Sequence, residues 1–153
     1  MGIEKEIHQE KFRSVKHKAM LNILFTNGWF TEKMKNILAP EDITPQQYNI
    51  LRILRGSFPQ PLSTLQIRER MLDRMSDTSR IVDRLVTKQL VKKVVCNKDR
   101  RLVDVTITEK GQNLLKRLDS QVNNMDSILS NITEKEAQTI SNLLDKLRDG
   151  NEK

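Results

Sequence analysis

The sequence has little cysteine, proline, glycine or aromatic residue, and each shortage narrows the classes of protein that it can encode. Its 153 residues include one cysteine, four prolines and five glycines, and aromatic residues make up 4%. The single cysteine, Cys96, excludes an internal disulfide and is typical of a reducing compartment. So few turn-forming residues favour helices over a many-turned β-protein, and the scarcity of aromatic residues predicts an aliphatic core.

The sequence also has no continuous apolar run of the length that a bilayer requires. Its first six residues, MGIEKE, include three charged side chains and lack the apolar core of a signal peptide. We therefore expect a cytoplasmic protein without a membrane partner. With 37% hydrophobic and 31% charged residues, residues 1–153 suit a single domain with its own core.

Positive charge is concentrated in the middle of the chain. The net charge is +7, and residues 66–101 contain 11 Lys or Arg against 5 Asp or Glu. The rest of the chain is almost neutral. Such segregation indicates a surface that binds a polyanion, although a basic face kept for solubility would look the same.

Hydrophobic spacing and capping signals predict most of the helices. Apolar side chains recur at helical spacing from Phe12 to Leu38, and the turn-forming pair Asn27-Gly28 leaves open a division into two shorter helices. Later helices are predicted to begin at Thr44, Ser63 and Thr133. At each of these positions a hydroxyl residue is followed three residues later by Gln or Glu, which is a capping box.

A helix from about Ser76 to Gln89 is followed by a change of period. Alternating residues predict strands over Val91–Cys96 and Val103–Ile107, joined by a polar hairpin tip. The fold class is therefore mainly α, a winged helix-turn-helix with a two-stranded β wing. A further long helix begins at Thr108, and its apolar residues follow a 3-4-3-4-3 spacing, typical of a seam between helices, at Leu115, Leu118, Val122, Met125, Leu129 and Ile132.

The helix from Ser76 separates into two faces. Ile81, Val82 and Leu85 fall on an apolar side, whereas Arg80 and Arg84 fall on the other among small hydroxyl residues. Arginine can bond both acceptors of a guanine edge in the major groove, which the small neighbours leave accessible. An ordinary amphipathic surface helix has a similar pattern. Asp83 is expected to hold one of the two arginines in a fixed rotamer.

The hairpin tip adds three cations, Lys98, Arg100 and Arg101. Cations at such a tip suit the strong negative potential of a narrow minor groove, and Asp99 could orient a neighbouring arginine. The alternative is a solvated turn, because hairpin tips are commonly charged. Beside a basic helix, the pattern favours DNA binding.

Two segments resemble the MarR (multiple antibiotic resistance regulator) family of winged-helix transcription factors. Residues 75–85, MSDTSRIVDRL, are similar to the family's recognition helix, and residues 99–111, DRRLVDVTITEKG, to its wing. Gln89 stands where the family usually has a flexible glycine, so it must adopt a strained turn or a different one. The resemblance implies that Arg101 enters the minor groove, that Asp99 braces the wing, and that the major groove is faced by Ser76, Thr78, Ser79, Arg80 and Arg84.

The resemblance also implies a homodimer on a pseudo-palindromic operator. A DNA-binding lobe is expected over about 43–111, flanked by a helical dimerisation lobe over about 1–38 and 112–150. The seam after Thr108, the final helix and the N-terminal stretch carry more apolar surface than one small domain can cover. Pairing two copies would bury it, although a monomer with its terminal helices folded back is the alternative.

By the same resemblance, a small aromatic or phenolic effector would release the protein from DNA. Trp29 and Tyr48 are candidates to line its pocket, although both suit the core. Cys96 lies away from the N-terminal position of the family's redox-sensing cysteines. His8 and His17 form no recognisable metal site, and we expect no cofactor.

The sequence therefore predicts a sequence-specific transcriptional regulator of double-stranded DNA, by family habit a repressor. Two alternatives remain: a non-selective architectural DNA binder, and a winged-helix module that binds another protein. An enzyme is not expected, because the sequence has no nucleophile elbow, phosphate-cradling glycine loop or zinc spacing.

Overall fold

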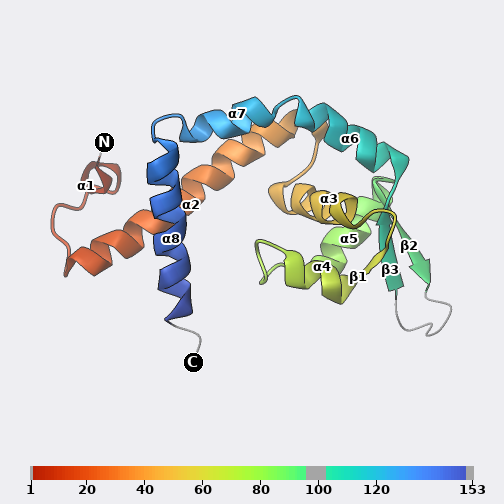
Figure 1. Ribbon diagram of the computed structural model, residues 1–153, viewed down its shortest axis with the longest axis horizontal. Coiled ribbons are helices and arrows are strands. Elements are labelled where there is room, and N and C mark those ends of the chain that lie inside the picture. Colours follow the sequence, from red (N-terminus) through yellow and green to blue (C-terminus); the bar gives the residue numbers. More distant parts are fainter. Residues whose placement is uncertain (1, 96–102, 151–153) are drawn as a thin grey trace.

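The computed structural model describes residues 2–95 and 103–150, and it shows a mainly helical chain with one small antiparallel sheet (Figure 1). A short helix, α1 (Ile3–Glu6), precedes the long helix α2 (Val15–Leu38). The hydroxyl of Ser14 caps α2 by accepting a 3.1 Å hydrogen bond from the backbone N–H of His17. The helix is continuous through Asn27-Gly28, so the alternative of two shorter helices is wrong. A glycine inside a helix costs only about 1 kcal/mol, which a long helix tolerates.

The chain then forms a winged helix-turn-helix, which we call the winged-helix lobe (residues 39–119). In chain order this lobe consists of η1 (Ala39–Glu41), α3 (Pro45–Ser57), β1 (Leu62–Ser63), α4 (Thr64–Arg70), α5 (Thr78–Thr87), β2 (Val91–Val95), β3 (Val103–Ile107) and α6 (Glu109–Asp119). The capping boxes predicted at Thr44 and Ser63 are both present at the beginnings of α3 and α4.

The sheet has three strands in the order β1-β3-β2, all antiparallel. Val91 pairs with Ile107 and Val95 with Val103 in the wing hairpin, while Leu62 of β1 pairs with Val105 on the other side of β3. The predicted two-stranded wing is confirmed as β2 and β3, and β1 is a third strand of the sheet that was not predicted. A strand of two residues is too short to show an alternating pattern in the sequence.

The prediction of one long helix from Thr108 to Ile132 is wrong, because α6 ends at Asp119 and the region that follows is interrupted. It consists of α7 (Val122–Asp126), the 3-10 turn η2 (Ser127–Leu129) and α8 (Glu134–Asp149), which begins at the capping box of Thr133 as expected. The hydroxyl of Ser120 donates to the carbonyl of Arg117 (2.5 Å), and that of Ser127 donates to the carbonyl of Asn124 (2.7 Å). Such short polar side chains compete with helical hydrogen bonding and favour helix ends.

The hydrophobic core lies almost entirely in the winged-helix lobe. Apart from Ile3, every buried apolar side chain among the described residues lies between Leu38 and Leu118. By contrast, we define the helical lobe as α1, α2, α7, η2 and α8, and Ile3 and Leu38 are its only buried residues among those whose side chains the structure describes. Figure 1 shows the two lobes as the ends of an arch, connected along its top by α2, α7 and α6.

Candidate nucleic-acid interface

The helix α5 is held in the winged-helix lobe by its apolar face. Val82 and Leu85 are fully buried and Ile81 nearly so, and they pack in the common core with residues of α3 and the sheet. Asp77 caps the helix, since its carboxylate accepts a 3.2 Å hydrogen bond from the backbone N–H of Arg80. The opposite face of α5 is therefore presented to solvent in a fixed orientation.

The outer face of α5 carries three of the five residues assigned to the major groove, Ser79, Arg80 and Arg84, all of them exposed. Among the described residues, neither guanidinium group has a hydrogen-bond or ion-pair partner, and both arginines are exposed to solvent. Ser76 is half-buried in the preceding turn, where its hydroxyl donates to the carbonyl of Asp73 (2.8 Å).

The expectation that Thr78 faces DNA is wrong, because its side chain is only 3% exposed. Thr78 lies three, four and seven residues before Ile81, Val82 and Leu85, so it shares their buried face. Its hydroxyl has no hydrogen-bond partner among the described residues.

Asp83 contacts the wing instead of an arginine of its own helix. Its carboxylate forms an ion pair with the ammonium group of Lys93 on β2. The expected pairing with Arg80 or Arg84 is therefore wrong. The pair connects the recognition helix to the wing, a role that sequence reasoning missed because ten residues and a turn separate the partners.

Gln89 lies in the turn between α5 and β2 and has a positive φ of 62°. Of the two expected alternatives, the strained turn is therefore the one present. The backbone N–H of Leu90 donates to the carbonyl of Leu85 (3.0 Å), and that of Gln89 to the carbonyl of Val86 (2.9 Å). These bonds form a Schellman motif, which ordinarily has glycine at this position. The hydroxyl of Thr108 donates to the carbonyl of Gln89 (2.7 Å) and fixes the direction in which the wing leaves the helix.

Gly111, near the beginning of α6, lies directly against this turn. A Cβ atom there would lie 2.3 Å from the carbonyl oxygen of Leu90 and 2.7 Å from the Cγ1 atom of Ile107. Only glycine therefore allows α6 to pack so closely against the base of the wing.

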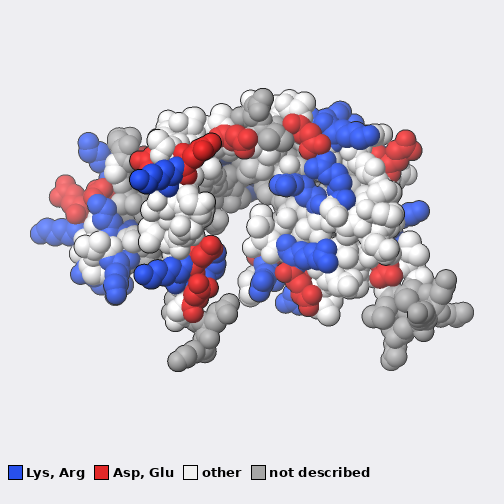
Figure 2. Space-filling view, in the orientation of Figure 1, with Lys and Arg blue, Asp and Glu red and all other residues white. Residues whose placement is uncertain are grey.

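The residues assigned to the wing tip, Lys98, Asp99, Arg100 and Arg101, lie outside the described residues. On the face shown in Figure 2, basic and acidic side chains are interspersed over both lobes. The basic side chains of the described residues therefore form no single patch in that view.

Two bidentate ion pairs fasten α6 to the rest of the winged-helix lobe. The Arg117 guanidinium contacts both oxygens of Glu41 on η1 (2.9 and 3.0 Å), and Arg55 of α3 contacts both oxygens of Asp119 (2.8 and 3.2 Å). The hydrogen bond from Arg117 holds the pKa of Glu41 below its ordinary value of 4.5.

The seam predicted for dimerisation is divided between two environments. Leu115 and Leu118 are buried in the core of the chain itself, so the assignment of these two residues to a dimer interface is wrong. Met125 is half-buried against the same core, whereas Leu129 is 46% exposed and Ile132 is half-buried. The side chain of Val122 lies outside the described residues.

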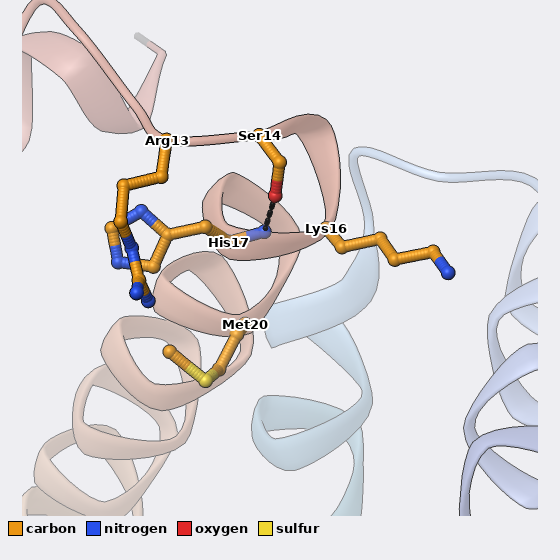
Figure 3. Close-up of a pocket in the computed structure, with 5 residues that line it drawn as sticks. All are labelled: Arg13, Ser14, Lys16, His17 and Met20. Atoms are coloured by element: carbon orange, nitrogen blue, oxygen red, sulfur yellow. Dashed lines mark hydrogen bonds between the residues drawn. The ribbon is translucent and has the colours of Figure 1, made fainter.

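Shallow hollows surround α2. Figure 3 shows one of about 390 Å³ at the beginning of the helix, where Arg13, His17 and Met20 lie together and Lys16 points away. A larger one of about 590 Å³ lies between α2 and the α7–η2 segment and is lined by Trp29, Lys33, Asn36, Ile37, Asn124, Ser127, Ile128 and Asn131. Trp29 thus lines a hollow, whereas Tyr48 is a core residue.

The described residues contain no group of three or more His, Cys, Asp or Glu side chains placed to hold a metal ion. Within residues 2–95 and 103–150, no helix has the length and apolar character needed to cross a membrane.

The geometry defines a winged helix-turn-helix with an exposed recognition helix, and comparisons with known proteins place it in a family. The sequence model of the MarR family matches residues 41–102. The crystal structure of a MarR transcription factor from Planctomyces limnophilus is 30% identical in sequence, covers 88% of this chain and 98% of its own, and has a TM-score of 0.68.

Two solved DNA complexes share the fold. The MepR–DNA complex of S. aureus is 20% identical, covers 92% of this chain and 99% of its own, and has a TM-score of 0.75. A mutant MarR from E. coli complexed with operator DNA is 21% identical, covers 96% and 99%, and has a TM-score of 0.75. The chain belongs to the MarR family. The family consists of transcriptional regulators, which confirms that the chain is not an enzyme.

Proposed function

We propose that this protein is a sequence-specific transcriptional regulator that binds double-stranded DNA as a homodimer. The observation that carries the proposal is the arrangement of α5, whose buried face fixes the helix while Ser79, Arg80 and Arg84 remain exposed. A major groove accepts one α-helix, and an arginine there can bond the O6 and N7 atoms of guanine together. The two fold relatives solved with DNA support this use of the surface.

A second copy of the chain would complete the helical lobe. Nine large apolar side chains of α2 and α8 are at least 39% exposed: Val15, Met20, Ile23, Leu24, Phe25, Trp29, Ile140, Leu143 and Leu147. So much exposed apolar surface on two long helices is typical of a subunit interface. A two-fold dimer would place two α5 helices about 34 Å apart, one turn of DNA.

Selection of binding sites from a random duplex pool tests the DNA-binding proposal. The wild type should recover a pseudo-palindrome with half-sites about one helical turn apart. Arg80→Ala should lose the motif, and Thr87→Ala, which changes an exposed residue at the far end of α5, should keep it. Binding without a recovered motif would favour an architectural role, and no binding at all would favour a protein-interaction module.

Sedimentation tests the dimer. Replacement of Ile140 and Leu143 with Lys should yield the mass of a single chain, because four buried charges per dimer would have no partners. Replacement of the exposed Gln138 and Asn142 of the same helix with Lys is the matched control for charge. An unchanged mass in the Ile140/Leu143 variant would exclude α8 from the interface.

We further propose that the protein is a repressor that a small aromatic ligand releases. The hollow between α2 and α7 supports this idea, because Trp29 and Ile37 offer apolar contact and Asn124 offers an amide. Salicylate serves as the probe: it should quench the fluorescence of Trp29, the only tryptophan, and weaken operator binding. Ligand binding that leaves DNA affinity unchanged would contradict release.

A further inference from the structure

Large apolar side chains lie in an unusual place, beside the beginning of α5. Met75 is 92% exposed and Leu65 is 63% exposed, although burial would favour both by roughly 2 kcal/mol. The two side chains line the same two hollows, together with Arg68, and the larger hollow of about 460 Å³ continues onto Ser76 and Ser79. The pair therefore adjoins the surface proposed to bind DNA.

The backbone that carries Met75 is fixed by hydrogen bonds. One oxygen of Asp73 accepts from the backbone N–H of Met75 (3.0 Å), and the other accepts from the side-chain amide of Gln46 on α3 (3.1 Å). The backbone N–H of Leu72 donates to the side chain of Asn49 (2.9 Å). The turn is thus attached to α3 at two points, and Met75 projects from an ordered position.

Charges of both signs surround this pair. Arg68 lines both hollows and Arg74 lines the smaller one. The carboxylates of Asp73 and Asp77 accept hydrogen bonds from neutral N–H groups, and Glu69 lines the smaller hollow. The two guanidinium groups beside Met75 could contact the phosphates of DNA, while the apolar pair itself offers no charge.

The major groove has one apolar group on its base edges, the 5-methyl group of thymine. The residues at the beginning of a recognition helix are those that reach base edges. We propose that Met75, supported by Leu65, reads a thymine in each half-site through contact with its methyl group. This inference rests on the proposed function, because it names a base that the same surface recognises.

Replacement of thymine by uracil tests the contact directly, since it removes the methyl group and preserves base pairing. The duplex is the one recovered by the wild type from the random pool, with thymines changed one at a time. Loss of one buried methyl group should weaken wild-type binding about fourfold in each half-site. Met75→Ala should bind the thymine and uracil duplexes equally.

Leu72→Ala is the matched control, because Leu72 is also 92% exposed in the same turn but lines neither hollow. It should discriminate thymine from uracil as the wild type does. Tight wild-type binding that no uracil substitution weakens would overturn the inference and leave the proposed function standing. Discrimination that persists in Met75→Ala would also overturn it. If the wild type binds no duplex, both proposals fall.

Discussion

The two lobes of this chain bury their apolar side chains to very different degrees. The winged-helix lobe packs residues from four of its own helices, its sheet and Leu38 of α2 into a core in which Leu54, Leu85 and Leu115 are at most 1% exposed. In the helical lobe, α8 has no buried residue, and Leu143 is 61% exposed. The first lobe has a buried core of its own, whereas the large apolar side chains of α2 and α8 are mostly exposed. The winged-helix lobe is therefore stabilised within the chain, and the proposed dimer would supply the cover that the helical lobe needs.

The largest predicted effect is a loss of stability, and it is tested by one substitution in each lobe. Leu115→Ala should reduce the free energy of unfolding by about 3 kcal/mol at any protein concentration, because it leaves a cavity in the core of one chain. Leu143→Ala should have little effect in dilute protein and a growing one as concentration rises, because in the proposed dimer its partner surface would belong to a second copy. Urea denaturation at two concentrations measures both. If the loss of stability relative to the wild type varies with protein concentration equally in the two variants, the contrast between the lobes is contradicted.

A smaller effect should arise within the stable lobe, at the ion pair between Glu41 and Arg117. The pKa of Glu41 is lowered in the folded state, so the pair stabilises the fold above the unfolded pKa and is lost as pH falls through the folded one. Glu41→Gln should therefore be less stable than the wild type at pH 7, by an amount that disappears in acid. Melting temperatures between pH 7 and pH 3 measure this difference, with the exposed Glu69→Gln as the control for charge. A constant difference across that range would contradict the role given to the pair.

The smallest effect concerns the turn that connects the recognition helix to the wing. Gln89 has a φ of 62°, a conformation that glycine adopts without steric cost. Gln89→Gly should therefore stabilise the winged-helix lobe by about 1 kcal/mol, even though it removes a side chain. Thermal unfolding measures the gain, and the same change at Gln112, a helical residue in α6, should be destabilising. A destabilised Gln89→Gly would show that the side chain contributes more than the backbone strain removes.

The elements with local signals could be predicted from the sequence. The capping boxes at Thr44, Ser63 and Thr133 mark the beginnings of three helices because side chain and backbone satisfy each other within four residues. The positive φ of Gln89 is one of the two alternatives that the resemblance to the family left open at this position. The apolar and basic faces of α5 followed from helical periodicity.

What could not be predicted depends on contacts between distant residues. The same spacing places Leu118 and Leu129 on one seam, yet the first is buried within the chain and the second is exposed. Thr78 is polar but lies on the buried face of α5, and periodicity is a better guide there than residue type. The pairing of Asp83 with Lys93 depends on how the wing folds back on the helix, which no local pattern encodes.

The long helix α2 ends in one lobe and begins in the other. Its last residue, Leu38, is fully buried in the winged-helix core, so that end moves with the recognition helix. With 24 residues the helix is about 36 Å long, and a tilt of roughly 5° at the opposite end shifts Leu38 by about 3 Å. That displacement is close to the rise of one base pair, about 3.4 Å. In the proposed dimer, a slight change of angle between the two subunits would therefore displace each winged-helix lobe by about the spacing of one base pair.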